Sequence, residues 1–434
     1  MSWMSKKPKV KKGSAIILTL VVIVALLIYA AAFISAGINQ SLIVEVSKRQ
    51  AGSFNLAEAG LDHAIVWLRS QPAPPIGNST DPWGASQNLG GGFYTVAITD
   101  LGAVGGSATI RRYKVTSTGT LNNVSRILTN YVQVDNYARY LWFTDREVFN
   151  GSNVWFWTED NLNGPTHTNG HFNIAGDPVF ESEVRSVDDY LRYFNNGNNI
   201  NSSELTNSPY DNPDFQQGVD FGAESIDMPS QALSLRSAAA NGGIYLRGNT
   251  TVVLNSNGTM NVTNSRNKWN NKNMALPANG ALFVNAGNLT ISGTLNGNLT
   301  VGANYDVIIP DSIVYADDPR TIPTSDDTLG IIAESDVVID DAAPYDLEID
   351  ACAMALNTSF MMENWWVGPA KGTLTVYGGI IQDERGPVGT FNGTTGTKVS
   401  GYAKNYSYDS RLLSSPPPFM PTTGDYITLS WEEN

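Results

Sequence analysis

The sequence predicts an α+β protein that is mostly β: one long N-terminal helix, then a small antiparallel sheet, then a parallel β-helix. Three observations predict this class: an uncharged apolar run near the start, alternating apolar residues after residue 92, and short apolar triplets that recur from residue 282. The composition agrees, because 40 glycines and only 16% charged residues favour short strands and tight turns. A chain of 434 residues is long enough for two or three structural units.

The charge is unevenly distributed along the chain. Residues 1–12 hold five lysines and no acid, so 22 basic and 41 acidic residues, a net charge of about −19, remain on the rest. Proteins that bind DNA or RNA neutralise phosphates with clustered lysine and arginine. The sequence therefore argues against nucleic acid as a partner.

Residues 14–38 read SAIILTLVVIVALLIYAAAFISAGI and contain no charge. As a helix, this run spans about 37 Å, enough to cross a hydrocarbon core of about 30 Å. A cleaved signal peptide, the alternative, has a shorter apolar run that ends in a small-residue cleavage pattern. We therefore predict a retained transmembrane helix, preceded by a basic cytoplasmic leader at residues 1–13. The protein would cross the inner (cytoplasmic) membrane once, with a periplasmic or extracellular head.

Residues 39–70 continue the helical pattern without a proline. Phe54, Leu61, Ile65 and Leu68 recur at helical spacing, and the pattern ends at the proline-rich QPAPP segment. We predict one helix that is apolar on all sides in its first half and amphipathic in its second. A membrane anchor followed by a separate surface helix is the alternative.

The segments KKG-SAIILTLVVIVALL and QAGSFNLAEAGLDHAIVWL give this region a recognisable identity. Over about residues 8–70 they resemble the PilX-type N-terminal domain of minor pilins, which serve type IV pili and pseudopili. The most specific stretch consists of Ala57, Glu58, Ala59, Gly60 and Leu61. The resemblance implies a helix that inserts into the membrane and packs with other pilins or pseudopilins.

The same resemblance implies a processing site. The basic-glycine junction for prepilin peptidase maps onto Lys12 and Gly13, with cleavage between Gly13 and Ser14. The fifth residue after this junction is Leu18, where most major pilins have glutamate; some minor pilins also lack this acid.

The region after the helix changes to short β-strands. Residues 71–92 are rich in proline, glycine, asparagine and serine, which predicts a linker. Residues 93–135 predict a small antiparallel sheet, because Tyr94, Val96 and Ile98 alternate with polar residues and a turn follows at residues 119–123.

Residues 136–434 predict a β-rich extracytoplasmic domain. Apolar triplets, many of them 7 to 10 residues apart, occur at 282–284, 289–291, 299–301, 307–309, 331–333 and 337–339. Such short strands can bury their inward residues only by stacking on neighbouring turns, which favours a parallel β-helix. An irregular β-sandwich is the alternative.

A second resemblance covers about residues 140–434. Its motifs include GPTHTNGHFNIAG, ISGTLNGNLTV, GTLTVYGGIIQ and GYAKNYSYDSRLLSSPPPF. They are similar to a poorly characterised extracellular domain that follows pilin-like anchors in bacteria, and that family implies no particular activity.

Aromatic and acidic clusters are the candidate binding sites. Trp142, Trp155 and Trp157 form either a platform on which sugars stack or a cap that closes the end of the solenoid, and the Trp365-Trp366 pair allows the same two interpretations. Asp336, Asp340 and Asp341 lie in an acid-rich stretch that predicts either structural Ca²⁺ or a solvated face.

Catalytic motifs such as GxSxG, GxxxxGK[ST] and HExxH do not occur in the sequence. His167 and His171 are four residues apart but lie among turn residues, and the single cysteine, Cys352, lies in an apolar run typical of a core. We therefore predict a non-enzymatic, membrane-anchored, minor pilin-like structural protein with an acidic head and no cofactor except possible structural Ca²⁺. A tethered carbohydrate-active β-helix enzyme and a glycan-binding surface adhesin are the alternatives.

Overall fold

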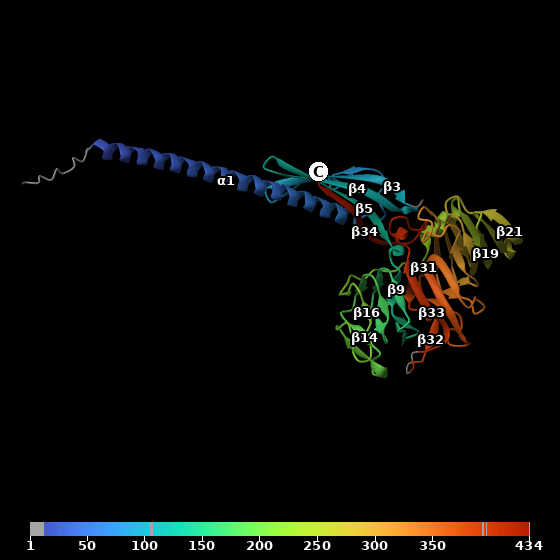
Figure 1. The fold of residues 1–434 in the computed structure, drawn as a ribbon. Helices are drawn as coiled ribbons and strands as arrows, with labels where there is room; N and C mark the ends of the chain where they lie inside the picture. Colours follow the sequence, from blue (N-terminus) through green and yellow to red (C-terminus); the bar gives the residue numbers. More distant parts are fainter. Residues whose placement is uncertain (1–12, 105–106, 393–394, 396, 434) are drawn as a thin grey trace, which may run out of the picture.

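The computed structural model describes residues 13–104, 107–392, 395 and 397–433 (Figure 1). The predicted basic leader lies outside the described residues, apart from Gly13. The chain divides into a stalk, formed by the N-terminal helix and an antiparallel sheet, and a β-rich head, which holds most of residues 137–421.

Helix α1 (Gly13–Arg69) is one continuous helix of 57 residues. It ends just before the QPAPP segment, as expected where prolines remove backbone donors. Residues 15–48 are exposed along their whole length, whereas the helix contacts the sheet from Gly52 onward. Within the described chain, one helix is long and apolar enough to cross a membrane, and it is α1.

The stalk sheet is antiparallel and has the order β1-β3-β4-β5-β34, with β2 paired to β3. Its strands are β1 (Ser79–Thr80), β2 (Gln87–Leu89), β3 (Gly92–Val104), β4 (Ser107–Leu121), β5 (Val124–Asn136) and β34 (Thr422–Glu433). Asn122 and Asn123, both with positive φ, form the turn between β4 and β5, which suits the twist of a two-residue hairpin.

The amphipathic half of α1 packs on this sheet through the predicted apolar stripe. Leu61 and Leu68 are buried, and Phe54 and Ile65 are partly buried against the same core. The helix and sheet approach closely at Gly119 of β4. A Cβ atom there would lie 2.2 Å from the carbonyl oxygen of Ser53 and 2.3 Å from the backbone nitrogen of Ala57. Glycine is therefore required for this contact.

The C-terminal strand β34 belongs to the stalk, although the sequence assigned residues 136–434 to the head. It pairs with β5 through Thr422↔Asn136 and Tyr426↔Val134, and the Arg69 side chain lies 2.6 Å from that of Asp425. Its partner strand lies almost 300 residues earlier in the chain, so no local pattern could predict this pairing.

The head contains three ladders of short strands, and neighbouring strands within each ladder are parallel. In spatial order the first ladder comprises β17 (Val219–Phe221), β13 (Val184–Ser186), β10 (Thr166–Thr168), β6 (Trp142–Arg146), β31 (Ala370–Glu384), β29 (Leu347–Ala355), β27 (Thr328–Ala333), β24 (Asn298–Ala303), β22 (Ala281–Asn285) and β18 (Ile244–Arg247).

The second ladder runs beside the first and shares the long strands β29 and β31 with it. Its other members are β16 (Asp214–Phe215), β12 (Val179–Phe180), β9 (Asn161–Asn163), β33 (Lys398–Tyr408), β26 (Ile313–Tyr315) and β23 (Leu289–Leu295). The third ladder contains β19 (Thr250–Asn255), β23, β25 (Val307–Ile309), β28 (Val337–Ile339) and β30 (Phe360–Met362).

The remaining strands extend these ladders or lie along their edges. β11 (Asn173–Ile174) and β14 (Leu191–Tyr193) are parallel, and β15 (Ile200–Ser202) is antiparallel to β14. Antiparallel pairs are also formed by β7 (Val148–Phe149) with β8 (Ser152–Asn153), by β20 (Thr259–Asn264) with β19 and β21 (Trp269–Ala275), and by β32 (Gly389–Phe391) with β33.

The order of strands in space differs from their order in the chain. The chain enters the head at β6, in the middle of the first ladder, and proceeds outward to β17. Residues 222–243, including helix α2 (Leu233–Ala240), then cross to the other end, and the strands from β18 to β31 lead back to the middle. There Ile380 of β31 pairs with Trp142 of β6. The head thus has an N-terminal half, residues 142–221, and a C-terminal half, residues 244–408, which meet at a junction next to the stalk (Figure 1).

Two apolar cores hold the head together. The first lies between the ladders and receives the inward residues of the predicted triplets, all six of which lie in strands. The second lies under α2 and under two short 3₁₀ helices, Tyr137–Arg139 and Ser410–Leu413. Cys352 is fully buried in this second core, and burial raises the pKa of its thiol.

Candidate binding site: an aromatic pocket at the junction

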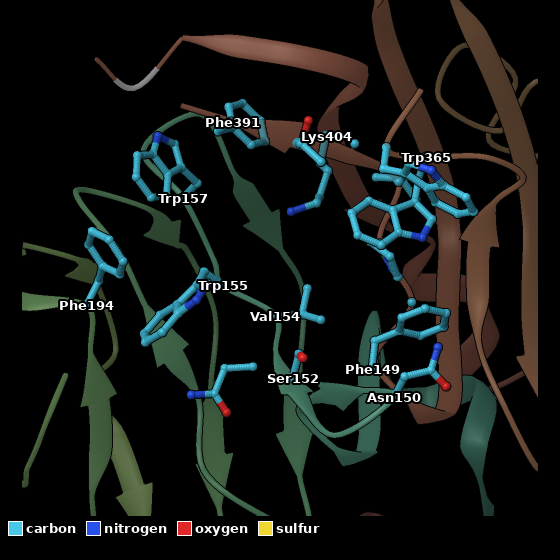
Figure 2. Close-up of a pocket in the computed structure, with 17 residues that line it drawn as sticks. Phe149, Asn150, Ser152, Val154, Trp155, Trp157, Phe194, Trp365, Phe391 and Lys404 are labelled. Atoms are coloured by element: carbon cyan, nitrogen blue, oxygen red, sulfur yellow. The ribbon is translucent and has the colours of Figure 1, made fainter. Parts of the chain in front are cut away.

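A pocket of about 620 Å³ lies where the two halves of the head meet (Figure 2). The N-terminal half contributes the loop and strand residues between 149 and 157 and also Phe194. The C-terminal half contributes Trp365, Trp366, residues 386–391 and Lys404. Its volume lies within the range of about 300–1,000 Å³ typical of small-molecule sites.

One wall of the pocket is built from four aromatic side chains. Trp157 stacks on Phe391, with 6.0 Å between the ring centroids and 11° between the planes. Phe194 packs edge-on against Trp155 at 5.5 Å and against Trp157 at 6.1 Å. These contacts hold each ring in place through its neighbours.

The opposite wall contains Phe149, Trp365 and Trp366. Phe149 meets Trp365 at 6.1 Å and 90°, and Trp365 meets Trp366 at 5.4 Å and 77°. Trp366 is 59% exposed, so it forms the rim. In Figure 2 the two labelled aromatic groups lie on either side of Val154, which leaves the space between them open.

A buried arginine supports the floor of the pocket. Arg385 is only 1% exposed, and its Nη1 donates to the Glu147 carboxylate at 2.9 Å and to the Val154 carbonyl at 3.2 Å. Its Nη2 donates to the Trp155 carbonyl at 3.0 Å. The guanidinium also lies 3.5 Å from the centroid of the Phe156 ring. Arg385 therefore joins the C-terminal half to the segment after β8 that carries Trp155.

A second buried ion pair crosses the same junction. The ammonium group of Lys404 lies 2.5 Å from the carboxylate of Asp160. Burial lowers the pKa of Lys404, and the neighbouring Asp160 opposes this effect. Among the described residues that line the pocket, none carries a carboxylate. Lys404, which is already paired, is thus the one charged side chain among the described lining residues.

The structure places the three tryptophans of the predicted platform in two environments. Trp155 and Trp157 line the pocket, but Trp142 is 2% exposed and stacks on Tyr406 in the first core. Trp142 is therefore not part of a surface platform. The Trp142 side chain faces the first core, because Trp142 lies on β6 in the middle of the first ladder. Phe194 and Phe391 were missed, because Phe194 lies 37 residues after Trp157 and Phe391 lies 25 residues after Trp366.

The three predicted calcium ligands each accept a hydrogen bond from a different partner. Asp336 accepts a hydrogen bond from the backbone of Ser359 at 2.9 Å, Asp340 accepts from the backbone of Ala342 at 2.7 Å, and Asp341 accepts from the Asn364 side chain. In the described part of the chain, no group of three or more histidine, cysteine or acidic side chains is placed to hold a metal ion.

The two histidines of the THTNGH stretch lie in different surroundings. His167 is fully buried in β10 and stacks on Phe143 at 5.1 Å, whereas His171 lies 2.8 Å from Asp188 and packs on Tyr190. Burial lowers the pKa of His167 to about 4.

We expect this histidine to make the head less stable in acid. A lowered pKa means that the unfolded chain binds the proton more readily, so stability is lost as the pH falls from 6.5 toward 4. The His167→Phe variant keeps the stacking on Phe143 but cannot titrate. The loss of unfolding free energy between pH 8 and pH 4.5 should be smaller in this variant by about 2 kcal/mol. Urea unfolding at the two pH values measures it, and an unchanged difference would contradict the assignment.

Part of the chain matches one protein-family model, and a solved pilin structure is similar to it. A family model described as a domain of unknown function (DUF4900) matches residues 94–188, from β3 of the stalk sheet into the N-terminal half of the head. No curated protein matches the sequence. The crystal structure of the competence-associated pilin ComZ from Thermus thermophilus is similar, with a TM-score of 0.35 and 10% identity, covering 89% of this chain and 98% of that chain.

Within the described residues, the protein thus combines one apolar N-terminal helix, a helix-on-sheet stalk and a β-rich head with an aromatic pocket.

Proposed function

We propose that this chain is a membrane-anchored, minor pilin-like protein that presents an acidic β-helical head outside the cytoplasm. The observation that carries the proposal is the division of α1 into two parts. Residues 15–48 contact nothing else in the described chain that would bury them, whereas residues 53–68 pack on the stalk sheet. An apolar helix of this length is stable in lipid or among partner helices and not in water.

Two further features support a pilin-like role. The residues of the PilX-like stretch lie where the helix meets the sheet: Ala57 and Gly60 are buried there, and Glu58 faces solvent. The lysines of residues 1–12 favour a cytoplasmic N-terminus, which leaves the acidic head on the other side. Other pilins or pseudopilins are then the natural partners of the exposed half of α1, in a type IV pilus or a related assembly.

The assignment of the head to the parallel β-helix class rests on its ladders. From β22 to β31, each passage of the chain through the three ladders adds one segment to each ladder, although β23, β29 and β31 are long enough to serve two ladders. Each new segment pairs in parallel with the one before it. Such strands bury their inward residues only through stacking, as in other solenoids.

The role we propose is binding, without catalysis. A glycosidase of the usual kind needs two carboxyl groups about 5–9.5 Å apart at the scissile bond. No carboxylate lies among the described residues that line the aromatic pocket.

The orientation of the protein in the membrane can be tested with an added cysteine on either side of the predicted transmembrane helix. The native Cys352 is fully buried and its pKa is raised, so it should give little background with a maleimide. We expect a membrane-impermeant maleimide to label a Ser203→Cys variant, whose site is exposed on the head, in intact spheroplasts. The Ser2→Cys variant should not be labelled before lysis, and after lysis it should be labelled in a chain that retains residues 1–13. Equal labelling of both before lysis, or a full-length protein that is soluble in the cytosol, would refute the proposal.

N-terminal sequencing of the membrane-bound protein distinguishes a processed, pilin-like anchor from an unprocessed one. A chain that begins at Ser14 would support cleavage after Gly13, whereas a chain that begins at Met1 would indicate an unprocessed membrane anchor.

A further inference from the structure

We propose that the aromatic pocket at the junction binds a neutral segment of a polysaccharide, with sugar rings lying against the indole faces. The inference goes beyond display of the head. It rests on the proposed function in one respect: the head must lie outside the cytoplasm to reach the polysaccharide. Binding by the pocket itself can be tested on the purified protein.

The lining of the pocket combines apolar aromatic faces with uncharged hydrogen-bonding groups, which match the apolar face and the hydroxyl edge of a sugar ring. Seven of the lining residues are aromatic, and they include four of the ten tryptophans of the chain. The C–H face of a pyranose ring is apolar and flat enough to pack on an indole, while its hydroxyl groups project from the edge. Asn150, Ser152, Asn153 and Thr390 supply uncharged donors and acceptors around the aromatic walls. Few polar groups in an aromatic setting are typical of sites that orient a small ligand.

The charges around the pocket favour a neutral ligand. A cation would find no carboxylate among the described lining residues, and it would meet the ammonium group of Lys404. An anion would gain little from Lys404, because Asp160 already neutralises it at 2.5 Å. The net charge of −14 also repels anionic polymers at long range.

The geometry favours a chain-like ligand held between two walls. The two walls stand on either side of Val154 (Figure 2), and each combines residues of both halves of the head. Arg385 holds the carbonyl groups of Val154 and Trp155, so one wall is fixed before a ligand arrives. Such preorganisation reduces the entropy lost on binding. Trp366, at the rim, can contact a sugar that extends out of the pocket.

The test uses the full-length protein in a detergent without a sugar headgroup. Cellohexaose, chitohexaose and maltohexaose are titrated separately, and binding is followed by tryptophan fluorescence and by calorimetry. Hexagalacturonate serves as the anionic probe. We expect at least one neutral hexasaccharide to bind and to change the tryptophan emission, and hexagalacturonate to bind more weakly.

Two matched variants assign the binding to the pocket. Trp366→Ala should weaken it by about tenfold, equivalent to about 1.4 kcal/mol, and should fold normally because this side chain is 59% exposed. Trp431→Ala removes a tryptophan that is 48% exposed on the stalk, and it should leave binding unchanged. The proposal is overturned if none of the three neutral hexasaccharides binds at millimolar concentration, if Trp366→Ala binds as tightly as the parent, or if hexagalacturonate binds more tightly than all three.

Discussion

Replacing Arg385 with methionine is expected to lower the free energy of unfolding of the head by about 3–5 kcal/mol. The variant would leave the buried carboxylate of Glu147 without its ion-pair partner, and the carbonyl groups of Val154 and Trp155 without the hydrogen bonds that Arg385 donates. A buried group that loses its partner keeps its full desolvation penalty, which is why the expected effect is large. Urea unfolding of the full-length protein in detergent, followed by tryptophan fluorescence, measures the change.

The junction offers a matched control for this experiment. Arg146 also crosses it, to Asp383 at 2.7 Å and to Glu384 at 3.1 Å, but its side chain is 52% exposed. Solvent screens such pairs, so Arg146→Ala should cost less than about 1 kcal/mol. Adding Glu147→Gln to Arg385→Met removes the unpaired charge and should restore part of the stability. Equal losses for the two arginine variants would mean that burial at the junction is not the source of the effect.

The Arg385 prediction also connects stability with the pocket. The same guanidinium links the two halves of the head and holds the backbone beside Trp155. Any sugar binding by this pocket should therefore weaken in Arg385→Met under conditions where the variant remains folded.

Gly119→Ala is expected to destabilise the stalk by about 3 kcal/mol, the upper end of the usual cost of overpacking. The added Cβ would lie 2.2 Å from the Ser53 carbonyl oxygen and 2.3 Å from the Ala57 nitrogen. Both are backbone atoms, so no side-chain rotation can relieve the clash and α1 must move away from β4. Urea unfolding measures the loss, and faster proteolysis of the segment after Arg69 would report separation of the helix from the sheet.

Gly37→Ala provides the same chemical change without the clash. Nothing lies within 4 Å of a Cβ at this position, on the exposed part of α1. Alanine is a better helix former than glycine by about 1 kcal/mol, so this variant should be unchanged or slightly stabilised. If Gly119→Ala were as stable as Gly37→Ala, the close contact between helix and sheet would not exist in the folded protein.

Local patterns predicted much of the fold. The uncharged run and the helical spacing of Leu61 and Leu68 predicted the helix and its buried stripe, because a helix repeats every 3.6 residues. The period of two in Tyr94, Val96 and Ile98 predicted the buried face of β3 in the same way. Each of these signals lies within a few residues of the chain.

The candidate site was only partly predictable. The aromatic character of Trp155 and Trp157 was visible, but the burial of Trp142 was not, because all three belong to one tryptophan-rich stretch. The partners on the other wall and on the floor, such as Trp365 and Arg385, lie more than 200 residues away.

The amino-acid order was sufficient to specify an apolar N-terminal helix, its amphipathic continuation and a series of short strands, since each depends on the periodicity of neighbouring side chains. Three-dimensional folding was needed to place β34 in the stalk, to join β31 to β6 in the middle of the head, and to form the pocket there. Those features depend on contacts between residues hundreds of positions apart, which long-range burial and backbone pairing select and no local periodicity encodes.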